Sequence, residues 1–123
     1  MIDRLQLLRL IPVVALQRAE DAEPLTDALC AGGLPCAEIT LRTDAALKII
    51  RALANRDDFL LGAGTVHSAE QAETAVDAGA RFVVTPGSIR GQSSGVRKTR
   101  CRYFPVLLRR RIWNWPWSTA LRS

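Results

Sequence analysis

Acidic residues are missing from the C-terminal part of this chain of 123 residues. All 12 Asp and Glu lie at or before Asp77, whereas residues 90–123 contain 9 Lys and Arg and no acid. Residues 1–89 hold 8 Lys and Arg against the 12 acids, so the net charge is −4 before residue 90 and +9 from there on. The overall pI of about 9.9 describes neither part, and it is no ground for assigning nucleic-acid binding to the whole chain.

Long apolar runs are also missing, which excludes a membrane-spanning helix on sequence grounds. At the N-terminus, Arg9 interrupts the apolar stretch and no small-residue cleavage pattern follows, so we expect no targeting segment. The three cysteines are an odd number without CxxC spacing, which indicates neither a disulfide framework nor a zinc site. A reducing, cytoplasmic location is the plain expectation.

Histidine is nearly absent, because His67 is the only one. Without a second His, neither a metal site nor a Ser–His or Cys–His pair is supported. We therefore expect no metal and no cofactor. His67 itself could be a general base, but an exposed residue just before a helix is the more common reading of such a position.

What the first 89 residues do contain is a regular alternation of strands and helices. Apolar runs of strand length are expected to form strands at residues 10–16, 34–41, 59–61 and 82–84. Helical spacing of apolar residues predicts helices between them, over residues 22–31, 43–54 and 68–79. Thr43 is expected to cap the second helix, and Ser68 with Gln71 forms a capping-box pattern before the third.

This alternation, with short links, predicts right-handed crossovers and a parallel sheet covered on both faces. Two architectures fit it, an open doubly wound sheet and part of a (β/α) barrel. In both, functional side chains gather at the carboxyl ends of the strands. Three strand ends are therefore of interest.

The first strand end has the sequence AEITLRT, residues 37–43. The two-residue period of a strand places Glu38, Thr40 and Arg42 on one face. An acid, a hydroxyl and a guanidinium in a row on a buried strand are costly unless they are paired or functional. An edge strand with a solvated face, or a structural Glu38–Arg42 pair, would explain the row equally well.

The second strand end is LGAGTV, residues 61–66. Gly62 and Gly64 would let the backbone approach a ligand closely, and Thr65 offers a hydroxyl. A tight strand-to-helix turn explains the glycines about as well, and His67 breaks the dinucleotide-binding pattern GxGxxG. The third strand end, TPG at residues 85–87, is by itself only a turn signal.

Taken together and in this order, the segments IPVVAL, AGGLPCAEITLRT, LGAGTV and DAGARFVVTPG resemble the bacterial 2-keto-3-deoxy-6-phosphogluconate (KDPG) and 4-hydroxy-2-oxoglutarate (KHG) aldolase family over residues 10–88. The resemblance implies an α/β fold, the (β/α)8 TIM barrel, of which about the first four βα units are present here. It also implies a cytoplasmic homotrimer and a metal-free class I aldolase. Such an enzyme cleaves its keto-acid substrate through a Schiff base to pyruvate and an aldehyde.

The resemblance carries roles to four residues. Glu38 matches the general acid and base, and Arg42 matches the group that binds the pyruvate portion, where a guanidinium fork suits a carboxylate. Thr65 matches a substrate-contacting hydroxyl, and Pro86 lines the pocket.

The family's imine-forming lysine, in a K-F-F-P-like strand, has no counterpart that we accept. The two lysines are Lys48, in a predicted helix facing away from the barrel interior, and Lys98. RYFP at residues 102–105 imitates the lysine strand, but arginine cannot form an imine and the segment comes too soon. We therefore interpret the chain as a truncated and inactive aldolase.

Residues 90–123 are predicted to lie outside the aldolase domain of residues 1–89. A basic tail that binds nucleic acid or anionic surfaces, an unrelated fused segment and a change of reading frame are the three alternatives. The codons favour the third, because WNWPW read two bases out of frame yields Glu, Leu and Ala flanked by Leu, Val or Met. The same shift permits PVFPGVATPS, which resembles the family's next strand and turn. We expect no specific nucleic-acid partner and no membrane contact.

Overall fold

The computed structural model describes residues 2–86 and 102–105. Helices alternate with strands along the described chain, as the sequence predicts. The elements are α1 (Ile2–Leu8), β1 (Val13–Val14), the short 3-10 helix η1 (Ala19–Asp21), α2 (Ala22–Ala31), β2 (Cys36–Thr40), α3 (Ala46–Leu53), β3 (Leu60–Gly64), α4 (Ala69–Asp77), β4 (Phe82–Thr85) and β5 (Arg102–Pro105).

All strands are parallel and their order in the sheet is their order in the sequence, β1-β2-β3-β4-β5. A doubly wound sheet places its first strand in the interior and reverses direction at a switch point. The sequential order seen here is that of a (β/α) barrel. It settles the choice between the two architectures that the sequence leaves open.

Local signals explain where the helices begin and end. The first helix of the alternation, α2, closes at a glycine pair, where Gly33 adopts a left-handed φ of 80° and the Leu34 amide donates to the Leu29 carbonyl at 2.9 Å. At the start of α4, Ser68 Oγ accepts a hydrogen bond from the Gln71 amide at 3.1 Å. The predicted capping role of Ser68 is confirmed.

The predicted capping role of Thr43 is wrong. The helix α3 begins at Ala46, and the residue at its N-cap, Ala45, has no side chain able to cap it. Instead, Thr43 Oγ1 donates to the carbonyl of Leu16 at 2.7 Å, which ties the loop after β2 to the loop after β1. The hydroxyl serves a contact between strand ends that the sequence pattern does not reveal.

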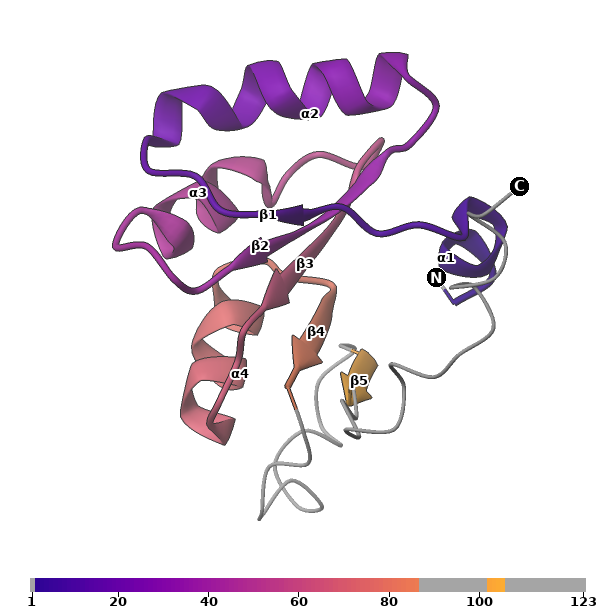
Figure 1. Cartoon of the computed structure of the whole chain (residues 1–123). Coiled ribbons are helices and arrows are strands. Elements are labelled where there is room, and N and C mark those ends of the chain that lie inside the picture. Colours follow the sequence, from indigo (N-terminus) through magenta and orange to yellow (C-terminus); the bar gives the residue numbers. More distant parts are fainter. Residues whose placement is uncertain (1, 87–101, 106–123) are drawn as a thin grey trace, which may run out of the picture.

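Helices α2, α3 and α4 cover one face of the sheet (Figure 1). The strand residues on this face, Ala37, Ile39, Leu61, Ala63 and Val83, form one buried cluster with apolar residues of the three helices. Alternate strand residues, Cys36, Glu38, Thr40, Leu60, Gly62, Gly64 and Phe82, lie on the opposite face, which we call the inner face.

The helix α1 lies apart from the other three helices (Figure 1). Its residue Leu5 packs on Cys36, Leu60 and Phe82, the first residues of β2, β3 and β4. The contacts of Leu5 therefore cover the inner face at the amino ends of the strands. Glu38 and Thr40 lie toward the carboxyl ends, outside this cluster. The sequence did not predict α1, because 7 residues are too few to show a helical period.

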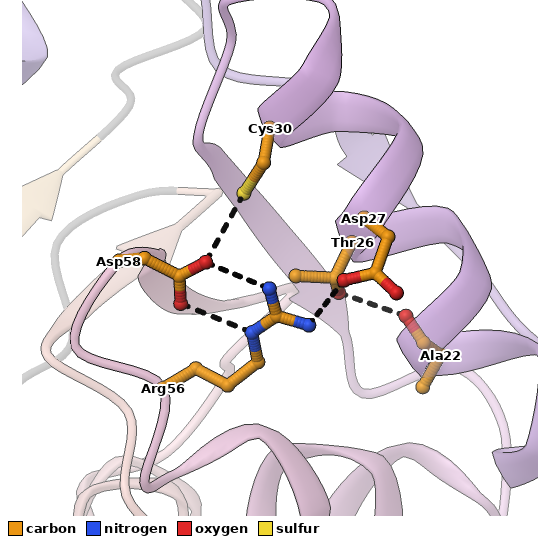
Figure 2. Close-up of polar contacts among 6 residues, drawn as sticks. All are labelled: Ala22, Thr26, Asp27, Cys30, Arg56 and Asp58. Carbon is orange, nitrogen blue, oxygen red and sulfur yellow. Dashed lines mark hydrogen bonds and ion pairs between the residues drawn. The ribbon is translucent and has the colours of Figure 1, made fainter.

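An arginine joins α2 to the connection between α3 and β3 (Figure 2). Two nitrogens of Arg56 contact the Asp58 carboxylate, Nε at 3.0 Å and Nη2 at 2.7 Å, and Nη1 contacts Asp27 Oδ1 at 2.6 Å. The thiol of Cys30 lies 3.8 Å from Asp58 Oδ2. This cluster holds the helix layer together near the amino ends of the strands.

The strands at the two ends of the sheet differ from expectation. β1 is confined to Val13–Val14 within the predicted run of residues 10–16, and β5 adds a fifth strand beside β4. β5 is the RYFP segment, and it neighbours β4 directly instead of occupying a later place in the barrel. The rest of residues 90–123 lies outside the described residues. None of the described helices has the length and apolar character needed to cross a membrane.

Candidate active site

Glu38 lies on the inner face of β2, two residues before the strand ends. It is only 8% exposed, although it is a carboxylate. β2 lies between β1 and β3 and all five of its residues are buried. The alternative of a solvated edge strand is therefore wrong.

Glu38 has no ion-pair partner among residues 2–86. Arg42 lies in the turn after β2 and is exposed, and no nitrogen of it comes within ion-pair distance of the Glu38 carboxylate. The alternative of a structural Glu38–Arg42 pair is therefore also wrong. An unpaired carboxyl in a buried position is a candidate for chemistry, because its charged form is costly there.

Burial raises the pKa of Glu38 above its ordinary value, and the positive charge of Arg42 opposes this increase. Loss of hydration disfavours the carboxylate more than the distant guanidinium favours it. A glutamate whose pKa is raised by burial is a candidate for a group that accepts and donates a proton. The site thus has the electrostatics of an acid–base group.

The glycines of β3 make room for side chains of the two neighbouring strands. A Cβ atom at Gly64 would lie 2.0 Å from Oε1 of Glu38, and one at Gly62 would lie 2.2 Å from the ring of Phe82. We expected these glycines to admit a ligand or to form a tight turn. Both glycines lie within β3, so they are part of the strand and not of a turn, and a side chain at either would meet Glu38 or Phe82.

Two threonines lie at the carboxyl ends of β2 and β3. Thr40 is buried and its Oγ1 donates to the Val14 carbonyl at 3.1 Å, so this hydroxyl joins β2 to β1. Thr65 follows Gly64 directly and adopts a left-handed φ of 57°. For a β-branched residue this conformation is an outlier, and such outliers concentrate at functional sites.

The other two predicted site residues lie at the same edge of the sheet, beyond the ends of β2 and β4. Arg42 is exposed and makes no hydrogen bond or ion pair with residues of the described segment 2–86. Pro86 is exposed just beyond the end of β4, and β3 separates it from β2. The structure thus places Glu38 on β2 beside Gly64 of β3, with Thr65 the next residue in the chain, and leaves Arg42 and Pro86 exposed beyond the strand ends.

His67 is exposed and lies just before α4, where its backbone amide donates to Gln71 Oε1 at 2.8 Å. The reading of His67 as a surface residue before a helix cap is confirmed. Within the described part of the chain, no group of three or more His, Cys, Asp and Glu is placed to hold a metal ion.

Sequence reasoning missed the roles of Gly64 and Thr43. Gly64 is needed for the space that Glu38 fills, and Thr43 fixes the loop that follows β2. Each role depends on a contact between strands, and the only signal in the sequence was the GAG spacing itself.

Comparison with known proteins places this geometry in a family. A sequence model described as the KDPG and KHG aldolases matches residues 1–108. The match thus continues beyond residue 88, where we expected it to stop, and it includes β5.

Individual relatives agree with the family model. Over 87 residues the chain is 54% identical to the 2-dehydro-3-deoxy-phosphogluconate aldolase of Haemophilus influenzae, covering 70% of this chain and 41% of the relative. It is 52% identical over 86 residues to the enzyme of the same name from Treponema pallidum, covering 69% and 41%. The chain therefore spans about two fifths of the length of these curated relatives.

Solved structures show the same fold. The KDPG aldolase of Legionella pneumophila, crystallised with pyruvate captured as a covalent carbinolamine intermediate, superimposes with a TM-score of 0.72 at 43% identity and covers 77% of this chain and 47% of its own. The strand order, the carboxyl-end site and these similarities agree. The chain belongs to the KDPG and KHG aldolase family.

Proposed function

We propose that this chain carries the proton-transfer part of a class I aldolase site that cleaves KDPG or KHG to pyruvate and an aldehyde. The observation that carries the proposal is Glu38, which is only 8% exposed and has no ion-pair partner within residues 2–86, on the inner face of a barrel-type sheet in a chain of the aldolase family. The whole reaction belongs to longer proteins, and the match to this chain covers only 41% of such a relative.

Aldol cleavage needs a group that takes and then returns a proton. A lysine imine at the keto carbon draws in the electron pair of the breaking carbon–carbon bond, while a base removes the hydroxyl proton of the departing aldehyde. A proton must then be returned to the resulting enamine carbon before hydrolysis releases pyruvate. A carboxyl such as Glu38, whose pKa is raised by burial, suits both steps.

The remaining predicted site residues supply binding. Arg42 presents a guanidinium fork at the rim, free of partners in the described segment, which suits the carboxylate of a keto acid. Thr65 offers a hydroxyl at the end of β3, and Pro86 follows the end of β4 at the same edge of the sheet. We assign the substrate carboxylate to Arg42 and a substrate oxygen to Thr65.

We further propose that the chain of 123 residues does not complete the reaction, because it supplies no imine-forming lysine to this face. Lys48 is exposed on α3, and α3 packs on the face of the sheet opposite to Glu38. Lys98 lies outside the described residues. Residues 1–89 would then be the aldolase domain, in a cytoplasmic protein whose intact form is a homotrimer.

The test uses a chain extended in the shifted reading frame until it includes the lysine strand. In this extended chain, Glu38→Gln should retain imine formation with pyruvate but slow proton transfer by a factor of roughly 10²–10⁴. Exchange of the pyruvate methyl protons for deuterium measures that step. Arg42→Ala should mainly raise the KM for the keto acid. An unchanged exchange rate in Glu38→Gln would remove Glu38 from the proposed role.

A basic tail that binds nucleic acid or anionic surfaces is the second candidate function, favoured only by the 9 Lys and Arg without an acid in residues 90–123. Such binding should weaken steeply with salt, because phosphate contacts release counterions. Deletion of residues 90–123 would abolish it if the tail were the binding element.

A further inference from the structure

β3 has no side chains on its inner face near its carboxyl end. Side chains from the two neighbouring strands occupy this space. Leu60 is followed on this face by Gly62 and Gly64, neither of which has a side chain. Phe82 leans over Gly62 from β4, and Glu38 leans over Gly64 from β2. The proton-transfer group therefore lies over β3 and not simply above its own strand.

We propose that Gly64 is a positioning residue for Glu38, because the missing side chain at Gly64 leaves the space that the Glu38 carboxyl occupies. A Cβ atom at Gly64 would lie 2.0 Å from Oε1, 2.5 Å from Cδ and 2.7 Å from Cγ of Glu38. All three distances are far below van der Waals contact. The functional meaning of this contact rests on the proposed role of Glu38 as the acid–base group.

A side chain at Gly64 would move Glu38 and leave β3 in place. β3 is held from both sides, by the Leu41 amide donating to the Gly64 carbonyl at 2.9 Å and the Arg81 amide donating to the Leu61 carbonyl at 2.8 Å. Glu38 reaches Gly64 through a chain of rotatable single bonds, which give way at lower cost than two strand pairings. We therefore expect Gly64→Ala to fold with the carboxyl displaced.

The position of the carboxyl matters for two reasons. It lies against Gly64, the last residue of β3, which directly precedes Thr65 in the chain. It also lies on the inner face of the sheet, where Glu38 is only 8% exposed and Phe82 is fully buried. Displacement from Gly64 would bring the carboxyl closer to solvent.

The first experiment measures the titration of Glu38 in the full chain of 123 residues, with glutamate labelled at its carboxyl carbon and observed by NMR. Glu38→Gln identifies the resonance. In Gly64→Ala the pKa of Glu38 should fall toward its ordinary value, because the displaced carboxyl regains water. An unchanged or higher pKa in Gly64→Ala would overturn the proposal.

The second experiment measures coupling between the two residues by urea unfolding. Gly64→Ala should lower the unfolding midpoint when Glu38 is present and lower it much less in the Glu38→Ala background. Gly62→Ala is the matched control, since it lies on the same strand and face but meets only Phe82 among its nearest atoms. Its effect should be the same with and without Glu38.

A failure of Gly64→Ala to fold is also decisive. If Gly64→Ala is unfolded but Gly64→Ala with Glu38→Ala folds, the space at Gly64 belongs to Glu38, as proposed. If both are unfolded, the space serves the backbone and the proposal is overturned. None of these measurements depends on catalysis, so a loss of the proposed aldolase role would appear separately, in the exchange assay with Glu38→Gln.

Discussion

Arg56 and Asp58 form a two-point ion pair, with Nε 3.0 Å from Oδ1 and Nη2 2.7 Å from Oδ2. The third contact of the guanidinium, to Asp27, connects this pair to α2 (Figure 2). The hydrogen bonds to Asp58 and Asp27 raise the pKa of Arg56. The hydrogen bond from Arg56 holds the pKa of Asp58 below its usual range. The cluster thus links two segments that are 29 residues apart.

Replacement of Arg56 should destabilise the chain, and a lysine should not restore it fully. Arg56→Ala removes all three contacts, whereas Arg56→Lys keeps the charge but loses the planar fork. We expect the urea midpoint to fall in the order wild type, Arg56→Lys, Arg56→Ala. Equal midpoints for Arg56→Lys and the wild type would mean that charge alone accounts for the stabilisation by this cluster.

The Asp58 pair should also be visible in the pH dependence of stability. Because its pKa is lower in the folded state than in the unfolded state, its contribution is present above the ordinary pKa of aspartate and is lost as the pH falls through the depressed value. Unfolding midpoints of Asp58→Asn and wild type should therefore differ at neutral pH and converge in acid. A difference that grows in acid would contradict this assignment.

Glu38 should show the opposite sign. Its folded-state pKa is raised above the ordinary 4.5, so its stabilising contribution is complete below that pH and is lost as the pH rises through the raised value. Glu38→Gln cannot ionise and should therefore become more stable than the wild type as the pH rises toward neutrality. Urea midpoints measured across this range test the sign, and parallel curves for the two proteins would show that Glu38 is not desolvated.

Thr65 stores backbone strain at the end of β3. Its φ of 57° lies in the left-handed region, which costs an L-residue roughly 1–2 kcal/mol. Glycine avoids this cost but loses about 0.5–1 kcal/mol in chain entropy. Thr65→Gly should therefore raise the free energy of unfolding by on the order of 0.5–1 kcal/mol. Thr65→Ser is the control and should give no such gain; a destabilised Thr65→Gly would show that the side chain contributes more than the strain costs.

The sequence predicted the alternation of elements well, because that alternation depends on local patterns. The bounds of α2 agree with the predicted residues 22–31, where Pro24 and the glycine pair mark its two ends. β1 is shorter than its apolar run, which contains Pro12, a residue without a backbone amide to pair. Strand order could not be predicted from local patterns, and only the family resemblance indicated a barrel.

The candidate site was predictable in composition but not in arrangement. The two-residue period correctly placed Glu38 on a face with Thr40. It could not show that Thr40 bonds to Val14, that Glu38 lies over Gly64, or that Arg42 extends into solvent, because each of these depends on the register between strands. The sequence also could not show that the glycines of β3 make room for the side chains of Glu38 and Phe82.

The gene offers a test of the proposed boundary near residue 90. We predict that the DNA encoding residues 87–97 contains an insertion or deletion of one or two bases relative to an intact aldolase frame. The shifted frame should stay open past Ser123 and encode a Lys-aromatic-aromatic-Pro strand. The codons for residues 103–105 permit Phe-Pro in both the given and the shifted reading frame. A family match that extends to residue 108 is therefore compatible with a change of frame before it. If the shifted frame meets stop codons at once or encodes no such lysine, residues 90–123 are a genuine basic tail.

Borohydride trapping of labelled pyruvate on the chain of 123 residues tests the central claim most directly. The claim is that the chain presents Glu38 at an aldolase-type site but supplies no lysine able to form the imine. Intact-mass and peptide measurements should show no more pyruvate adduct on the folded chain than on the urea-unfolded chain or on Lys48→Ala. A stoichiometric adduct on the folded chain, located at Lys48 or Lys98, would contradict the claim.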